Sequence, residues 1–206
     1  REAMDAFAIE SLTRAQRAID EGLNQKEIAP VTIRTRRGEH TVSVDEQPHK
    51  ANLEKIPQLR PAFTENGTIT PANSSSISDG ASALLLASEQ AVETHGLTAR
   101  ARIVAHSRNS LAPEAFTLAP IGAAEAVLAK AGWTVADVDL WEINEAFAMV
   151  TMLTVDALKL DPACVNVHGG ACAQGHPIGS TGSRIIVTLM HALEHYGKKR
   201  GVAALC

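Results

Sequence analysis

The strongest constraint on the fold is a regular alternation of short apolar runs and amphipathic segments from Ala101 to the last residue. Short apolar runs are typical of buried strands, and longer segments with apolar spacings of three and four are typical of helices. The expected strands are 102–105, 138–143, 164–167 and 202–206, and the expected helices are 120–131, 145–159 and 178–196. Alternating strands and helices imply crossover connections, so this part is predicted to be α/β, in the order βαβαβαβ, with a largely parallel sheet.

The residues before this region follow a different pattern. Apolar spacings of three and four predict an amphipathic helix over 1–22, and alternating residues over 30–45 predict a β-hairpin. A loop with two prolines and mixed charges is expected over 47–60, and an Ala- and Leu-rich helix over 79–94. There is no low-complexity segment and no short repeat. This portion is therefore predicted to supply separate elements ahead of the α/β part.

Composition narrows the class of protein. The 206 residues include 19 Lys and Arg against 23 Asp and Glu, without a basic run, so we expect no nucleic acid as partner. No segment reaches the roughly 18 apolar residues that span a bilayer, so we expect no membrane. Three cysteines do not make a disulfide framework, which favours a reducing compartment. The chain begins inside a helical pattern and ends in a strand-like run, so we expect it to be a fragment.

Three residues with useful chemistry follow three successive expected strands. Asn144 follows the strand that ends at 143, His176 lies in the glycine-rich loop after the next strand, and Cys206 ends the last one. They are 32 and 30 residues apart, about one βαβ unit each. In open α/β sheets, ligands bind beyond the carboxyl ends of the strands. We therefore expect an amide, an imidazole and a thiol to converge on one crevice.

His176 has a physical reason to act as a base. Pro177 suits the first position of a helix, so the imidazole is expected near a helix N-terminus. The positive end of the helix dipole disfavours an imidazolium and favours a thiolate on a neighbouring cysteine. Five glycines of this loop would let the backbone approach a ligand, namely Gly169, Gly170, Gly175, Gly179 and Gly182. Alternatively, the glycines serve turns and helix packing, and His176 is a satisfied loop histidine.

Two long motifs in this region resemble signatures of the thiolase family. They are NEAFA at 144–148 and GGACAQGHPIG at 169–179. The final run 201–206 resembles the strand that leads into the family's third signature, and the segments 60–63 and 73–81 are thiolase-like too. The resemblance covers essentially the whole chain. It implies the C-terminal half of a thiolase-like fold, a mostly parallel sheet with helices on both faces, preceded by parts of the loop domain and the N-terminal domain.

The resemblance implies CoA-dependent acyl transfer, in which a cysteine is acylated and a second acetyl-CoA joins the acyl group by Claisen condensation. His176 matches the histidine that activates the nucleophile and helps to stabilise the thioester oxyanion. Asn144 matches the residue that holds a water completing the oxyanion hole, and Cys206 matches the acid/base that moves the α-proton. The resemblance implies no cofactor besides the CoA thioesters that are substrates, and no metal.

The resemblance also implies a substrate pocket. Ser75 matches a serine that contacts pantetheine, and Phe116 and Phe147 match positions that line the acyl or pantetheine pocket. The segment 116–120 is most similar to the short-chain acetyl-CoA acetyltransferases of the family, which interconvert two acetyl-CoA with acetoacetyl-CoA and CoA. His49 stands where many relatives have an arginine near the CoA nucleotide.

Several alternatives accompany this interpretation. The motif of the nucleophilic cysteine is missing, since neither Cys164 nor Cys172 occupies it, so the chain alone is expected to be inactive. The closest alternative activity is that of a longer-chain 3-ketoacyl-CoA thiolase of β-oxidation. A second alternative is a non-catalytic folded or interaction module. The sequence His191-Ala-Leu-Glu-His195 fits a zinc-peptidase pattern, but without a convincing third ligand we expect an exposed helix face.

The resemblance suggests an organisation and a setting for the protein. Residues 1–58 resemble the end of the loop domain, 59–98 the end of the N-terminal domain, and 99–206 the C-terminal domain without its last strand. The implied partners are CoA and acyl-CoA, and we expect a homodimer or homotetramer of the full-length protein. We expect a cytoplasmic location, with a mitochondrial or peroxisomal one as the alternative.

Overall fold

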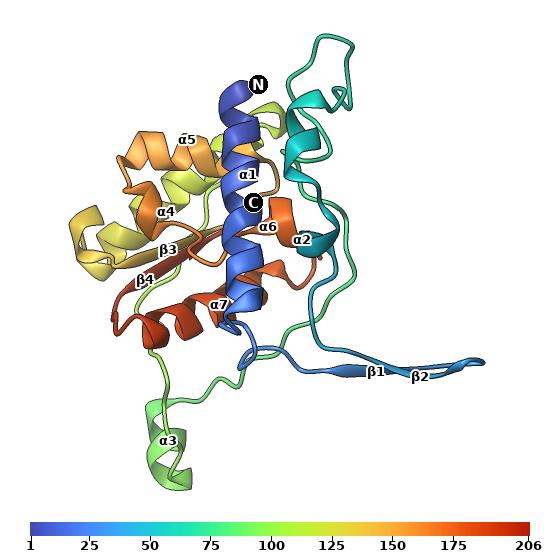
Figure 1. The fold of residues 1–206 in the computed structure, drawn as a ribbon. Coiled ribbons are helices and arrows are strands. Elements are labelled where there is room, and N and C mark those ends of the chain that lie inside the picture. The colour runs from blue at the N-terminus through green and yellow to red at the C-terminus, as the bar shows by residue number, and fades with distance from the viewer.

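The computed structural model describes residues 1–206 (Figure 1). In chain order its elements are α1 (Glu2–Asp20), β1 (Val31–Thr35), β2 (Gly38–Val42), α2 (Gln47–Lys50), α3 (Glu89–His95), α4 (Ala119–Ala131), β3 (Leu140–Ile143), α5 (Ala148–Leu158), α6 (Ala171–Gln174), α7 (Thr181–His195) and β4 (Gly201–Ala204). Short 3₁₀ helices lie at Leu53–Gln58, Pro113–Leu118, Val135–Asp137 and Pro162–Cys164. None of the helices combines the length and the apolar character that a bilayer crossing requires.

The centre of the α/β part is the parallel pair of strands β3 and β4. Their register runs from Leu140 opposite Gly201 to Ile143 opposite Ala204. The pairing continues beyond β3, because the backbone N–H of Asn144 donates to the carbonyl of Ala204 over 2.9 Å. The carboxyl ends of both strands therefore meet at Asn144, where the expected site lies.

Helices cover both faces of this strand pair, as Figure 1 shows for α4 and α7. Successive side chains of a strand point to opposite faces. Trp141 accordingly packs in one apolar cluster with Leu128 of α4, and Leu140 packs in another with Leu189 of α7. The expected α/β class, with a parallel pairing and helices on both faces, is confirmed.

Helix α1 connects the start of the chain to the loop that contains the glycine-rich motif. It has one apolar face, whose residues Leu12 and Ala15 are buried against Ile56 and against Ala173 of α6. The expected helix over 1–22 is thus present with nearly the expected bounds. Most of its stability comes from this buried face, because helices gain more from packing than from intrinsic propensity.

The prediction of a strand over 164–167 was wrong. The segment forms a single bridge to β3 through Val165. Asn166 has a left-handed backbone with φ of 48°, which interrupts an extended run. The carbonyl of Val165, which a sheet neighbour could otherwise use, accepts from the Arg14 side chain over 2.6 Å.

Two further expected elements are also absent or shorter. The segment 102–105 pairs with no strand, and its Ile103 is 71% exposed. The helix expected over 79–94 is confined to α3, which begins where the Ser88 side chain accepts a backbone N–H. The preceding Leu85 is 87% exposed, so no packing supports a helix there.

The expected hairpin is present as the antiparallel pair β1–β2. It pairs from Val31 opposite Val42 to Thr35 opposite Gly38 and projects away from the body of the structure (Figure 1). Every residue of β1 is exposed. The hairpin therefore contributes nothing to the site at the end of β3.

Candidate active site

Two of the expected site residues meet at the carboxyl end of β3. Asn144 follows the last residue of β3 and is 2% exposed, and His176 lies in the loop before α7 and is 9% exposed. The Asn144 Nδ2 atom is 3.3 Å from the His176 Nε2 atom. An amide and an imidazole thus face each other at a site that is almost completely buried.

The surroundings of His176 hold the ring on its other side. The backbone N–H of His176 donates to the carbonyl of Ser76 over 2.8 Å. The Nδ1 atom lies 2.7 Å from the hydroxyl oxygen of Thr181, which is fully buried. The ring is therefore fixed at both nitrogens and through its own backbone.

The electrostatic setting keeps the imidazole of His176 neutral. Burial lowers the pKa of His176, and the positive charge of Arg184 lowers it further. The helix end expected at Pro177 does not lie there, because α7 begins at Thr181. The direction of the expected effect is present, but desolvation is its main cause. A neutral ring can accept a proton at physiological pH.

The expected pocket residues lie next to this pair. Both the backbone N–H and the hydroxyl of Ser75 donate to the carbonyl of Ala146, over 3.1 and 3.0 Å. Phe147 follows directly, and its ring meets that of Phe116 edge to face, with centroids 6.1 Å apart. Extended backbone at Phe147 also delays the start of α5, which was expected at 145. The structure therefore brings all three residues into one region.

Cys206 lies at the same end of the sheet without joining the pair. It stands two residues beyond β4 and is exposed, and its Sγ atom makes no hydrogen bond to His176 or Asn144. Partial burial raises the pKa of the Cys206 thiol. Desolvation is the larger influence on Cys206, and it favours the neutral thiol.

A buried carboxylate next to Asn144 ties several segments around the site together. Glu145, which follows Asn144, is fully buried and accepts three hydrogen bonds. They come from the Ser11 hydroxyl over 2.7 Å, the Asn166 side-chain amide over 2.8 Å and the Cys172 backbone N–H over 3.0 Å. Burial raises the pKa of Glu145, and these donors oppose the rise. The network joins α1, the 166–172 loop and the residue next to Asn144.

Two glycines of the motif are required by close packing. A Cβ atom on Gly170 would overlap the carboxylate of Glu145. Gly175 has φ of 88°, and a Cβ atom there would overlap the Ser78 side chain. Packing is therefore the role that the structure gives to these two glycines, as the alternative interpretation held.

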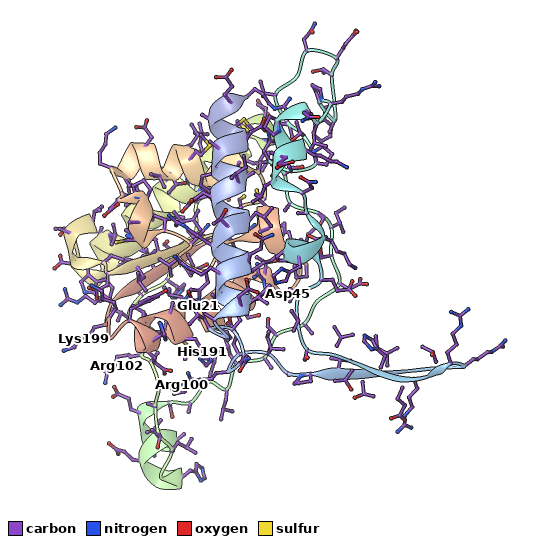
Figure 2. All side chains as sticks on the ribbon, viewed as in Figure 1. Glu21, Asp45, Arg100, Arg102, His191 and Lys199 are labelled. Carbon is purple, nitrogen blue, oxygen red and sulfur yellow. The ribbon has the colours of Figure 1, made fainter.

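The zinc-peptidase pattern on α7 does not form a metal site. No group of three or more His, Cys, Asp or Glu side chains could hold a metal ion. Instead, Arg100 lies beside His191, where Figure 2 labels both, and its guanidinium is 2.6 Å from the Glu194 carboxylate. This pattern marks a surface contact that ties the segment after α3 to α7.

Comparison with known protein families shows the family to which the chain belongs. Residues 97–206 match the thiolase C-terminal domain, and residues 1–90 match the thiolase N-terminal domain. The chain belongs to the thiolase family. The motifs of this thiolase chain that carry Asn144 and His176 both lie in the C-terminal match.

Curated relatives resemble the thiolase chain over its whole length. It is 47% identical to the cytosolic acetyl-CoA acetyltransferase of Mus musculus, with 100% of this chain and 53% of the mouse protein covered. It is 41% identical to the mitochondrial 3-ketoacyl-CoA thiolase of Bos taurus, with 100% and 52% covered. The chain thus spans about half the length of the curated relatives that it matches.

Solved thiolase structures have the same fold. The acetyl-CoA acetyltransferase of Bacillus anthracis superimposes with a TM-score of 0.96 at 41% identity, over 100% of this chain and 52% of that one. The Acat5 thiolase of Ascaris suum, solved in complex with coenzyme A, superimposes with a TM-score of 0.89 at 39% identity, over 100% and 52%. The expected thiolase fold is confirmed.

The sequence motifs did not single out some residues that build the site of this thiolase chain. Thr181 and Ser11 belong to common residue types that carry no motif of their own. Ser11 is also 134 residues away in sequence from Glu145, to which it donates. Glu145 lay inside a motif but received no role. The signal that could have found Thr181 is its position at the start of α7, five residues after His176.

Proposed function

We propose that the protein carrying this thiolase chain is an acetyl-CoA C-acetyltransferase. It joins two acetyl-CoA molecules into acetoacetyl-CoA and CoA, and it runs the reverse cleavage. The observation that carries the proposal is the buried contact of Asn144 with His176 over 3.3 Å, beside Ser75 and the two phenylalanines. The names of the mouse and Bacillus anthracis relatives support the acetyl-CoA assignment.

The first half-reaction uses His176 and Asn144. The Nε2 atom of neutral His176 takes the proton of an attacking cysteine thiol. The thiolate forms a bond to the thioester carbonyl carbon, and Asn144 positions hydrogen-bond donors at the oxygen that becomes negative. The carbon–sulfur bond to CoA then breaks, and CoA leaves with the proton from His176. A neutral, buried imidazole suits this exchange.

The second half-reaction uses Cys206. Its thiolate removes the α-proton of a second acetyl-CoA, and the resulting carbanion attacks the acyl-enzyme carbonyl. The bond to the nucleophilic sulfur breaks, and the proton held by Cys206 returns to that cysteine. In the cleavage direction the Cys206 thiol instead donates its proton to the departing carbanion. Because burial raises the pKa of the Cys206 thiol, the protonated form that donates in cleavage is the major one, and the condensation uses the minor thiolate form, whose proton has been released to solvent.

The nucleophilic cysteine is assigned to none of the three cysteines of this chain. Cys172 is partly covered, and burial together with the Glu145 charge raises the pKa of its thiol well above the usual range. Such a thiol is a poor nucleophile, because the thiolate is the attacking species. We therefore propose that turnover requires a further cysteine, and that the 206 residues by themselves are inactive.

The substrates are CoA thioesters, with no other cofactor. Ser75 contacts the pantetheine arm, and Phe116 and Phe147 line the pocket for the acyl or pantetheine group. The complex of the Ascaris suum relative with coenzyme A supports this class of ligand. A longer-chain 3-ketoacyl-CoA substrate is the closest alternative, and the name of the bovine relative favours it.

The organisation and setting of the protein follow the same family. Residues 1–58 form the end of the loop domain, 59–98 the end of the N-terminal domain, and 99–206 the C-terminal domain. The full-length protein is a homodimer or homotetramer. It is cytoplasmic, as the name of the mouse relative suggests, and the bovine relative makes a mitochondrial location the alternative.

The test begins with the intact mass of the purified protein, followed by an acetoacetyl-CoA cleavage assay on the same sample. The 206 residues have a mass of 21.8 kDa. A larger protein that contains this sequence should cleave acetoacetyl-CoA with CoA, and His176→Ala should abolish turnover. His40→Ala, on the exposed hairpin, is the matched control and should leave the rate unchanged.

Three outcomes would count against the proposal. Turnover by a protein of 21.8 kDa would overturn the assignment of the nucleophile outside the chain. Faster cleavage of longer 3-ketoacyl-CoA than of acetoacetyl-CoA would favour the alternative substrate. A larger protein that binds CoA thioesters without cleaving any of them would favour a non-catalytic module.

A further inference from the structure

The hydroxyl of Thr181 occupies a position that no motif explains. It is the first residue of α7, and its side chain is fully buried. Its Oγ1 atom is 2.7 Å from His176 Nδ1 and 3.0 Å from the carbonyl oxygen of Pro177. One hydroxyl thus lies between a ring nitrogen of the central histidine and a backbone carbonyl.

Counting hydrogens assigns the direction of both bonds. A hydroxyl carries one hydrogen, and a carbonyl oxygen can only accept, so the Thr181 hydrogen points to Pro177. The Thr181 oxygen must then accept from His176 Nδ1–H. A neutral imidazole has only one N–H, so Nε2 carries a lone pair. That nitrogen faces the Asn144 Nδ2 group, which can only donate.

The opposite tautomer disagrees with the contacts on both sides of the ring. It would require the Thr181 hydroxyl to turn its hydrogen away from the Pro177 carbonyl. It would also place a His176 Nε2–H against the Asn144 NH₂ group, unless that amide turned over as well. The Thr181 side therefore favours the Nδ1–H tautomer, and the Asn144 amide in its present orientation agrees with it.

We propose that Thr181 is a positioning residue that holds His176 as its Nδ1–H tautomer, with the Nε2 lone pair directed into the site. The catalytic consequence rests on the proposed function. Nε2 is then the atom that takes the proton of the attacking thiol and returns it to CoA. Because Nδ1–H donates to Thr181 in both the neutral and the protonated ring, the bond between His176 and Thr181 is kept during the transfer.

The direct test is the tautomer of His176 in the 206-residue chain. The chain has eight histidines, so the ring signals of ¹⁵N-labelled protein are assigned with His176→Ala. Wild type should show a protonated Nδ1 and an unprotonated Nε2 at neutral pH. Thr181→Val, which removes the acceptor, should shift the population towards Nε2–H, and Thr181→Ser should restore the wild-type pattern.

A matched control separates this effect from a general disturbance of α7. Thr188→Val makes the same change at a buried position of the same helix, where the hydroxyl donates to Glu27. It should leave the His176 signals in place. A wild-type spectrum with Nε2–H would overturn the proposal even if Thr181→Val failed to fold. An unchanged tautomer in folded Thr181→Val would overturn it as well.

Kinetics of the active, larger protein provide the second arm. Thr181→Val should lower kcat by about 100-fold with little change in KM, since general acid–base catalysis contributes about 10²–10⁴-fold. Thr181→Ser should recover most of the rate. A correct tautomer without acyltransferase activity would refute the proposed function and leave the role of Thr181 intact. Wild-type kcat in Thr181→Val would refute that role.

Discussion

Glu145→Gln should destabilise the fold by far more than Glu142→Gln, although the two carboxyl groups are three residues apart and at most 3% exposed. Glu145 accepts hydrogen bonds from Ser11, Asn166 and the Cys172 backbone. Glu142 is buried without such donors, and its Oε1 atom has no partner. Burial raises the pKa of both groups. The two substitutions therefore separate the effect of burial from that of hydrogen bonding.

The magnitude follows from the donors around Glu145. A glutamine in its better orientation keeps the bonds from Ser11 and Cys172 but sets its NH₂ group against that of Asn166. An unpaired buried donor costs about 1–3 kcal/mol, and the two remaining bonds lose about 1 kcal/mol each without charge assistance. Glu142→Gln measures the gain from removing a buried ionisable group. The difference between the two variants should be about 3 kcal/mol or more.

The assay is urea unfolding at about pH 8, well above the ordinary pKa of a carboxyl group. Trp141, on β3 and 2% exposed, provides the fluorescence signal, and far-UV circular dichroism checks that the transition is two-state. Free energies of unfolding that differ by less than about 1 kcal/mol between the variants would refute the argument that the three donors stabilise this carboxylate.

Three further predictions concern packing and pH. Gly170→Ala should cost about 1–3 kcal/mol in urea unfolding because its Cβ would overlap a buried carboxylate, whereas Gly179→Ala, with no atom within 4 Å, should be nearly neutral; equal effects would contradict this. Burial lowers the pKa of His168 to about 4, so unfolded chains bind a proton first, and stability should fall by up to about 3 kcal/mol as pH drops from about 6.5 to 4. His168→Leu should remove this fall and His40→Leu should not, when unfolding is measured across that range. Burial raises the pKa of Glu27 to about 6, so the folded chain holds this proton more tightly than the unfolded chain. The free energy of unfolding should therefore decline by up to about 2 kcal/mol as pH rises from about 4.5 to 6. Glu27→Gln should flatten that decline, and an unchanged profile would argue against the burial of this carboxyl.

Sequence patterns predicted the elements whose stability is local or whose faces are buried. The helix over 120–131 and the strand over 138–143 appear as α4 and β3, because their apolar residues pack on one another. The pattern failed at 164–167, where Asn166 takes a left-handed backbone for contacts that no local pattern encodes. It was only partly right at 79–94, where the helix is confined to α3 behind the local Ser88 cap and the exposed residues before it have no packing surface.

The candidate site was predictable in part for the same reason. Asn144 follows β3, and the segment before His176 still bridges to β3 through Val165, so both residues lie at the carboxyl end of that strand. Thr181 and Ser11 were not predictable, because their roles depend on contacts made only in the folded chain. The exposed position of Cys206 beyond β4, without a hydrogen bond to His176 or Asn144, was not predictable either, since the spacing alone placed all three residues in one crevice.

The attachment of α1 to the far end of the chain has a consequence for biosynthesis. Arg14 binds the carbonyl of Val165, 151 residues further along, and Ser11 binds Glu145. At synthesis rates of about 5–20 residues per second, Arg14 of α1 waits roughly 8–30 s for Val165 to be made. During that interval Leu12 lacks Ala173, the later partner in its buried cluster, although Ile56 is made much sooner. We expect such a nascent chain to need protection from aggregation until the glycine-rich loop emerges and α1 docks against it.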